Sequence, residues 1–595
     1  MAPYSYQVLN AESEEIRLVR LQPGKGGDQI CLDIFHVSLK QPTLQPKQAR
    51  DTLAELQKTL PQDHVVKETL DGRYIFSLRG TNIISSSWDH PVPGFDRTRY
   101  ELPEDDYLPG PRYEPEYEAL SYTWASELPS TKANVSSSAI SGRGFVAEIE
   151  LGGNLASALK HIRHEDKSRV LWIDAICINQ KDDEERNFQV KRMGNIYSFA
   201  RRVIVWLGPE GEDSTHALSM LQSLAMQVEL TNDNSLCATP GASRPNWYYP
   251  FSPLPLDMFS DTTWSSIRSL FSRAWFSRVW VVQEVALANK FTILHCGDYF
   301  LPWLDLRKAI GILRAKLSTP EEIKSILDPQ VPGIPPQTMR PLSKLLRFVR
   351  RRNCQIPHDK VYGILSLASP VLSSLIEPKY EDAAARVFTD VSLAHLKLTK
   401  RLELLQYCSI STQYPGTPSW VPNWERGPRT VLFGLRTGHA RQASGHSAAD
   451  YLLPSDNTLQ VAGVRCAHVK SVGGVAEGNV DQIFDIIRTW EPEGLCKDSY
   501  PPGGSMLDAF LEAVFQGCLR DRFPRAVSWP TLSELRQHYL ALLSGIDRRA
   551  NIQNYLQNGV AEAANFFTTK EGYFGVAECD INEGKCPLYC YRFSF

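Results

Sequence analysis

The sequence predicts an α/β protein whose main domain is built on a parallel sheet. An apolar run, Leu171-Trp-Ile-Asp-Ala-Ile-Cys-Ile-Asn-Gln180, ends in polar residues and leads to an acidic helix start at Asp182. A second apolar run, Val203-Ile-Val-Trp-Leu-Gly208, closes the segment. Two apolar strands joined by an amphipathic helix are typical of a β-α-β unit. We therefore expect residues 171–173 and 203–206 to form neighbouring parallel strands.

Helix and strand signals around this unit support the same fold class. Asn154 is expected to cap a helix whose apolar residues recur at i, i+3, i+4 and i+7, so that one face packs on the sheet. Glu185 follows Asp182 by three residues and completes an acidic first turn, which the helix dipole favours. Upstream, residues 16–24 alternate apolar and polar positions, a pattern that predicts a half-exposed strand.

Composition limits the classes of function. With 595 residues, 43% hydrophobic and 22% charged, the chain is predicted to be globular and to hold two or three domains. A formal net charge of -3 gives no general attraction to nucleic acid or to an anionic membrane. The sequence lacks a secretory signal and a run of ~18 apolar residues, so we predict a cytoplasmic protein without a transmembrane segment. No metal site is predicted, since Cys579, Cys586 and Cys590 have no neighbouring histidine.

Three segments have an unusual density of Trp, Tyr and acid-amide residues: 117–124, 171–180 and 273–284. In order and residue by residue, they resemble the three blocks of the fungal heterokaryon incompatibility (HET) domain. Residues 358–368 and 418–424 resemble elements that recur downstream of such domains. The resemblance implies a cytoplasmic effector of non-self recognition that triggers programmed cell death. It also implies self-association and an incompatibility partner protein, and no nucleic acid.

The resemblance divides the chain into five parts. These are an N-terminal strand segment that packs on the HET domain (1–38), a divergent insertion (39–116), the HET domain (117–297), a mainly helical middle region (298–420) and a β-rich C-terminal region (421–595). Members of the family usually continue past the equivalent of Gly575 with a longer barrel-like tail, whereas this chain ends at Phe595. A truncated or a replaced end of the last region is therefore expected.

Candidate binding residues follow the predicted strands. In a parallel sheet, side chains beyond the carboxyl ends of the strands converge on one crevice. This places Ser121, Tyr122 and Trp124 near Asp174 and Asn179. The alternative is that the acid and the amide only cap turns and that the tryptophans of the strands are core residues. The sequence leaves both interpretations open.

Glu284 is the sharpest catalytic candidate. A helix in the third block places it on one face with Trp280, beside bulky apolar groups. Burial there raises the pKa of a carboxyl unless a cation pairs with it, and Arg278 and Arg273 are candidate partners. A structural salt bridge from Glu284 to one of these arginines is the alternative to a catalytic role.

A second resemblance bears on this choice. Trp280-Val-Val-Gln-Glu284 is similar to the Trp-x-x-x-Glu of TIR domains, whose glutamate is catalytic in the members that cleave NAD. The similarity extends to the order of the strands, so it implies a TIR/flavodoxin-like parallel sheet. It implies an NAD glycohydrolase with Glu284 as the catalytic residue, NAD as the substrate and no tightly bound cofactor. The substrate-binding residues under this hypothesis are Ser121, Tyr122, Trp124, Asp174, Asn179, Trp280 and Gln283.

Two departures bear on this hypothesis. Ala125 stands where family members usually have Gly, and no Gly-x-Gly-x-x-Gly follows the first strand, which argues against a redox NAD site. Two molecular activities therefore stay open. One is an assembly-activated NAD hydrolase centred on Glu284, and the other is a non-enzymatic homotypic interaction or signalling domain in the same pathway.

Overall fold

The computed structural model describes most of the chain as two compact units, Met1–Glu381 and Asp382–Phe595. The described residues are 2–38, 50–78, 86–103, 115–124, 127–137, 147–211, 213–249, 252–316, 318–330, 341–408, 412–426, 448–455, 457–463, 467–501, 503–522, 529–546, 549–556 and 564–577. Ala125, the three C-terminal cysteines and the chain end after 577 lie outside this set. The boundary between the units falls inside the predicted middle region 298–420.

A ten-stranded mixed sheet forms the centre of the first unit, in the order β1-β9-β8-β3-β2-β10-β7-β11-β14-β15. Four adjacent strands are mutually parallel: β10 (Arg169–Trp172), β7 (Glu118–Ser121), β11 (Arg202–Trp206) and β14 (Ile293–Cys296). In chain order this is 2-1-3-4, the order of the flavodoxin-like doubly wound sheet. The predicted α/β class with a parallel core is confirmed.

The prediction that β10 and β11 are neighbours is wrong, because β7 lies between them. Leu171 pairs with Glu118, and Val203 pairs with Ala119. The connecting helix α4 (Asp183–Phe199) begins where expected, with the Asp182 carboxylate accepting the Glu185 amide. Apolar periodicity identifies strands but not their lateral order. All four residues of β7 are buried, as a central strand requires.

The N-terminal segment extends the sheet on the side of β10. The strand β2 (Glu15–Leu21) pairs antiparallel with β10 and with β3 (Cys31–Ser38). Its residues are buried on both faces, including Arg17 at 0% exposure, so the half-exposed strand expected there is instead an interior strand. Beyond β3 follow β8 (Thr131–Ser137), β9 (Ala147–Leu151) and β1 (Ala2–Pro3).

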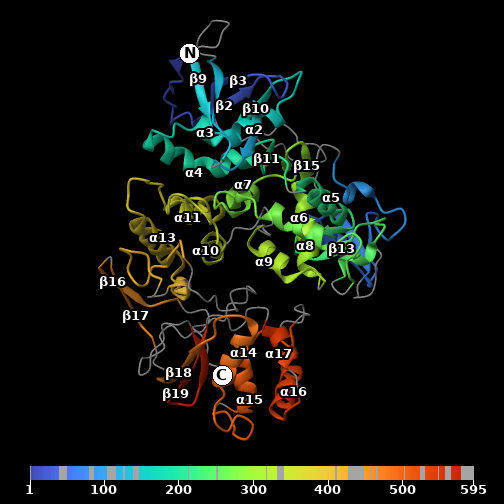
Figure 1. Ribbon diagram of the computed structural model, residues 1–595, viewed down its shortest axis with the longest axis vertical. Coiled ribbons are helices and arrows are strands. Elements are labelled where there is room, and N and C mark those ends of the chain that lie inside the picture. The colour runs from blue at the N-terminus through green and yellow to red at the C-terminus, as the bar shows by residue number, and fades with distance from the viewer. Residues whose placement is uncertain are drawn as a thin grey trace. The chain divides into compact units, whose positions relative to one another are not determined.

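Helices cover this sheet (Figure 1). The first is α2 (Gly153–Ile162), whose N-cap is Gly152 and not Asn154 as predicted. Asn154 lies inside the first turn, where its amide donates to the Thr123 carbonyl at 2.8 Å and accepts the Trp206 indole N–H at 2.9 Å. These bonds to strand ends compete with capping, which explains the shift. The next helix is the single turn α3 (Asp174–Cys177).

The rest of the first unit contains a small sheet and further helices. The described part of the insertion forms α1 (Leu53–Thr59), β4 (His64–Glu68), β5 (Tyr74–Leu78), β6 (Ser86–Ser87) and η1 (Arg97–Arg99). Helices α5 (Ser214–Ala225), α6 (Asp261–Phe271) and α8 (Trp303–Ala315) pack side by side, next to the hairpin β12 (Val228–Leu230)–β13 (Leu236–Ala238) (Figure 1). The remaining elements are η3 (Pro245–Tyr248), η4 (Ala274–Ser277), α7 (Val281–Ala286), β15 (Tyr299–Pro302), α9 (Glu321–Gln330), α10 (Leu342–Arg350), α11 (Asp359–Tyr362), η5 (Leu365–Leu367) and α12 (Pro370–Ser374).

The second unit combines helices with two small antiparallel sheets. It begins with α13 (Ala384–Thr399) and η6 (Glu403–Tyr407), followed by the hairpin β16 (Tyr451–Ser455)–β17 (Thr458–Val461). A three-stranded sheet of β18 (Val469–Val475), β19 (Asn565–Thr569) and β20 (Phe574–Ala577) packs on α14 (Val480–Thr489), α15 (Met506–Val514), α16 (Leu532–Leu543) and α17 (Arg549–Leu556). The predicted helical and then β-containing regions are present, with these four helices as an unexpected addition.

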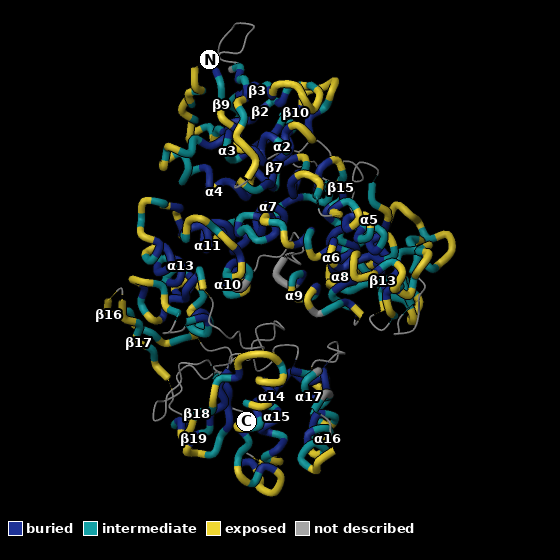
Figure 2. Tube along the Cα trace, viewed as in Figure 1, coloured by how far each residue is buried: buried dark blue, intermediate teal, exposed yellow. Residues whose placement is uncertain are grey.

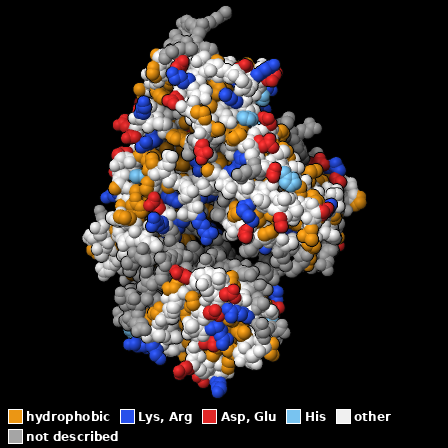
Figure 3. Space-filling model, viewed as in Figure 1, with side chains coloured by type: hydrophobic (Ala, Val, Ile, Leu, Met, Phe, Trp, Pro, Cys, Tyr) orange, Lys and Arg blue, Asp and Glu red, His pale blue; other side chains and the backbone are white. Residues whose placement is uncertain are grey.

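Burial and charge agree with a globular chain. The central strands of the large sheet are buried, while exposed residues gather on loops and outer helix faces (Figure 2). Acidic and basic side chains are interspersed over the visible face (Figure 3), in keeping with the net charge of -3. None of the described helices is long and apolar enough to cross a membrane.

Candidate functional site

A pocket of about 520 Å³ lies at the carboxyl ends of β7 and β10. Trp124 lines it from the segment after β7, and Asp174 and Gln180 line it from the segment after β10. Arg278 and Trp280 contribute from the stretch between η4 and α7. Ligands of doubly wound sheets bind outside the carboxyl ends of the strands, and this volume lies within the range of small-molecule sites.

Asp174 is the carboxyl group at the end of β10. Its Oδ2 accepts the Trp124 indole N–H at 2.9 Å, and its Oδ1 accepts the Ala175 amide at 2.7 Å. The Tyr122 phenol also hydrogen-bonds this carboxyl group. Burial raises the pKa of Asp174, while the positive charge of Arg278 opposes that shift. The Trp124 side chain is 40% exposed, so part of its indole face is open to a ligand.

Glu284 lies in α7 and is 1% exposed. It accepts a hydrogen bond from the Ser121 hydroxyl at the end of β7, and the Trp275 indole donates to the same hydroxyl oxygen at 2.8 Å. Burial raises the pKa of Glu284 to about 7, although Arg278 and the bond from Ser121 favour the charged form. Burial therefore favours the neutral form of this carboxyl group more than water does. It is not among the residues that line the pocket.

The predicted salt bridge to Glu284 is absent among the described residues. Arg273 donates to the carbonyl oxygens of Leu207 and Pro209, at 3.1 and 2.9 Å, and Arg278 donates to the carbonyl of Tyr122. Both arginines are thus occupied by strand-end carbonyls. The ion-pair alternative is wrong, and the neutral donor Ser121 takes the place of the expected cation.

Only some of the other predicted site residues line the pocket. Tyr122 is 3% exposed and Gln283 is fully buried, with the Gln283 Oε1 accepting the Ser366 amide at 3.3 Å. Asn179 caps a turn, because its Oδ1 accepts the Lys181 amide at 3.3 Å. Among the predicted substrate-binding residues, those that line the pocket are Trp124, Asp174 and Trp280. The predicted residues that do not line the pocket are Ser121, Tyr122, Asn179, Gln283 and the catalytic candidate Glu284.

A second wall of the pocket comes from residues to which sequence reasoning gave no role. Asp359 and Tyr380 line the pocket, and the Tyr380 hydroxyl donates to Asp359 Oδ1 at 2.7 Å. The Trp280 side chain hydrogen-bonds the same carboxyl group, and burial raises its pKa. The Arg186 guanidinium lies 4.2 Å from the centre of the Tyr380 ring. A signal was available, because Asp359 belongs to the segment 358–368 that resembles a recurring element of the family.

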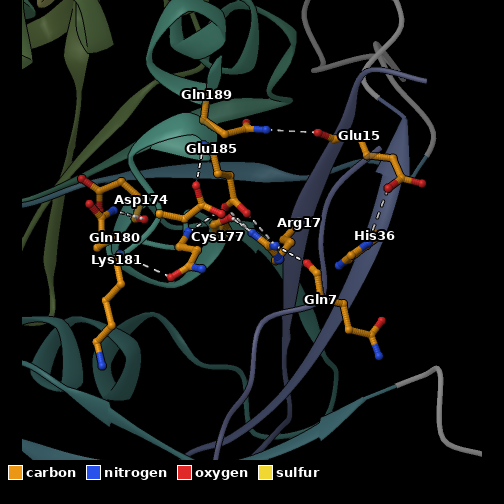
Figure 4. A network of polar contacts seen from close by, with 12 residues as sticks. Gln7, Glu15, Arg17, His36, Asp174, Cys177, Gln180, Lys181, Glu185 and Gln189 are labelled. Atoms are coloured by element: carbon orange, nitrogen blue, oxygen red, sulfur yellow. Dashed lines mark hydrogen bonds and ion pairs between the residues drawn. The ribbon is translucent and has the colours of Figure 1, made fainter. Parts of the chain in front are cut away.

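A buried ion pair holds the turn that follows Asp174 (Figure 4). The Arg17 guanidinium on β2 contacts both carboxylate oxygens of Glu185, at 2.5 and 2.9 Å, and donates to the Cys177 carbonyl at 3.1 Å. It also donates to the carbonyl of Gln7. Glu185 in turn accepts the Asn179 amide at 2.7 Å. The N-terminal segment thereby fixes the turn between α3 and α4, at the edge of the pocket.

The fold and the pocket define an α/β domain with a ligand-sized site at the carboxyl edge of its parallel strands and a buried carboxyl group bonded to the end of β7. The family model of the heterokaryon incompatibility protein (HET) matches residues 117–284, so this part of the chain is similar to a HET domain. A similar protein is heterokaryon incompatibility protein 6, OR allele, of Neurospora crassa, which is 27% identical over 368 residues. The alignment covers 52% of this chain and 53% of that protein, so the chain spans about half the length of this relative. No solved structure matches the chain.

Proposed function

We propose that the chain is a cytoplasmic effector of heterokaryon incompatibility whose HET domain cleaves NAD when protomers assemble, and that this activity triggers cell death. The HET match and the relative named for heterokaryon incompatibility support the biological role. The observation that carries the chemistry is the convergence of Ser121, Asp174 and Glu284 at the carboxyl ends of adjacent parallel strands. Self-association and an incompatibility partner protein belong to the same proposal.

The pocket suits a nucleotide of this kind. Its volume of about 520 Å³ lies in the range of small-molecule sites. Trp124 and Trp280 line it and offer aromatic surface for the rings of the substrate. In the proposed step, the bond from C1′ of the ribose to the pyridinium nitrogen breaks, and its electron pair neutralises the departing nicotinamide. No general acid is needed, unlike in ordinary glycoside hydrolysis. Water then adds to C1′ and releases a proton.

Glu284 is assigned the electrostatic role in this step. An ionised carboxylate near C1′ stabilises the oxocarbenium-like transition state. A pKa of about 7 allows the group to ionise at neutral pH. Its exposure of 1% in the single chain fits a site that opens on assembly of protomers. Because the site opens only when protomers assemble, the hydrolase is inactive in the cytoplasm until assembly is triggered.

The test compares NAD content in cells that express the wild-type chain, Glu284→Gln or Glu184→Gln. Glu184 is an exposed glutamate of α4 and serves as the matched control. Forced clustering of the wild type and of the control should deplete NAD and kill the cells. The Glu284→Gln substitution should slow NAD loss about 100-fold, the scale of one lost electrostatic contact in a transition state. If clustered wild-type protein kills cells while NAD stays intact, the hydrolase proposal is wrong.

A second candidate is a non-enzymatic interaction domain that signals by homotypic association. One observation favours it: Glu284 is buried and bonded to Ser121, an arrangement that also suits a purely structural residue. The two candidates differ in one outcome of the same experiment. An interaction domain predicts that cells expressing clustered Glu284→Gln protein die as fast as cells expressing the wild type.

A further inference from the structure

Two carboxyl groups from separate segments of the chain line the pocket and are held in the same way. Asp174 is bonded by the indole of Trp124 and by the phenol of Tyr122. Asp359 is bonded by the side chain of Trp280 and by the Tyr380 hydroxyl. Each carboxylate is therefore oriented by one tryptophan and one tyrosine, all neutral donors. We call Asp174 and Asp359 the acceptor clamp.

The negative charges of the acceptor clamp have no cation of the protein in direct contact. Within the described residues, neither carboxylate forms an ion pair with a lysine, arginine or histidine side chain. The two nearby guanidiniums of the lining are otherwise engaged, Arg278 with the Tyr122 carbonyl and Arg186 with Asp183 at 2.9 Å. A buried carboxylate without a counter-charge is costly, and such groups concentrate at functional sites. The charge of Arg278 acts on both carboxyl groups through space. A cationic ligand in the pocket supplies the direct ionic contact that neither carboxylate has within the described residues.

Hydrogen-bonding capacity also remains for a ligand. An ionised carboxylate accepts up to about four hydrogen bonds. Asp359 receives two from the protein, and Asp174 receives three when the Ala175 amide is included. The free acceptor positions suit hydroxyl groups, as when a carboxylate binds the ribose of a dinucleotide. Trp124 and Trp280 lie beside these positions, and tryptophan faces attract cations.

We infer that the acceptor clamp binds a positively charged ring that carries vicinal hydroxyls, the chemistry of an N-ribosyl pyridinium, and selects it over the same molecule with a neutral ring. This inference rests on the proposed function, since it specifies which half of NAD the pocket recognises. It also assigns Asp359 as a ligand-contacting residue. Because the HET family match ends at residue 284, the complete site includes the segment 353–380, which supplies the second wall.

The test uses the full chain carrying Glu284→Gln, so that bound ligand is not consumed. NAD and NADH are titrated separately by calorimetry, since the two molecules differ mainly in the charge of the nicotinamide ring. The expected result is binding of NAD at least about tenfold tighter than NADH. Adding Asp359→Asn should weaken NAD binding about tenfold and leave NADH nearly unchanged, so the two affinities become similar. Asp298→Asn, in the exposed turn between β14 and β15, is the matched control and should change neither affinity.

A second variant tests the same interaction in case the Asp359→Asn protein does not fold. Tyr380→Phe keeps the ring under Arg186 but removes the hydroxyl that orients Asp359. It should lower the preference for NAD severalfold with an unchanged melting temperature. Equal affinity for NAD and NADH, or no binding of NAD at millimolar concentration, overturns the inference. Selective binding without NAD loss in cells rejects only the hydrolase. NAD loss in cells without selectivity in vitro rejects only the acceptor clamp.

Discussion

At the scale of single residues, Glu284 combines deep burial with a pKa near neutrality. Its folded pKa of about 7 lies above the ordinary value of 4.5 because water is excluded from the carboxyl group. Between these two values, the unfolded chain releases the proton while the folded chain keeps it. Rising pH therefore favours unfolding across this window, and the penalty is complete above about pH 7.

Glu284→Gln should remove this penalty, since an amide does not ionise. Relative to the wild type, the variant should gain stability progressively between pH 4.5 and 7, by up to about 3 kcal/mol at 1.4 kcal/mol per pH unit of pKa shift. Denaturant unfolding at a series of pH values measures the difference. Glu184→Gln, at an exposed position of the same domain, should give a difference that does not change with pH. A flat pH dependence for Glu284→Gln would mean that the folded carboxyl group titrates normally.

Sequence reasoning at this scale placed Glu284 in one site with Ser121 but expected an arginine as its direct partner. Helical spacing placed Glu284 beside Trp280 and predicted its burial correctly. The expected arginine partners were wrong because Arg273 and Arg278 donate to carbonyl groups at strand ends and form no ion pair with Glu284 within the described residues. Ser121 is far from Glu284 in the sequence, and only the lateral order of the strands brings the two together.

At the scale of secondary-structure elements, the β2 strand is coupled to the turn between α3 and α4 through Arg17 and Glu185. The two side chains are 0% and 9% exposed and form a two-pronged ion pair. Removal of one partner from a buried pair leaves an uncompensated charge, which costs about 3–5 kcal/mol. The loss of stability should be greatest at the turn between α3 and α4, which Arg17 contacts.

Arg17→Met should therefore destabilise the first unit by about 3 kcal/mol or more. Hydrogen exchange should speed up for the amides of residues 177–185. Arg20→Met is the control on the same strand, because the Arg20 side chain is 40% exposed whereas that of Arg17 is fully buried. Its effect should stay below about 1 kcal/mol. Equal effects of the two substitutions would show that the buried pair does not anchor the turn.

Element types were more predictable than element neighbours. The apolar runs at β10 and β11 and the acidic start of α4 were read correctly, because each depends on residues close in sequence. The position of β7 between them depends on pairing across about 80 residues. The second wall of the pocket was not predicted for the same reason. Asp359 reaches the site only through the packing of helical segments beyond residue 284. Local patterns carry no information on such contacts.

At the scale of the whole molecule, the pocket belongs entirely to the unit Met1–Glu381, whereas the HET match covers only residues 117–284. A fragment of residues 1–381 should therefore unfold in one cooperative thermal transition and resist protease. A fragment of residues 117–284 lacks β2, which pairs with β10, and lacks the wall that contains Asp359. It should be protease-sensitive or aggregate, because an unpaired interior strand edge is exposed. Circular dichroism melts and limited proteolysis compare the two, and equal cooperativity would contradict this division.

The position of β2 also has a consequence for synthesis of the chain. Arg20 of this strand pairs with Val170, about 150 residues later, so β2 leaves the ribosome well before its partner strand. Translation at about 5–20 residues per second leaves that edge, and the apolar side chains of Ile16, Leu18 and Val19, without their final cover for roughly 7–30 seconds. Nascent chains on one polysome then carry matching open edges close together, which favours aggregation during translation. Chaperone supply should limit the yield of this protein more than its final stability does.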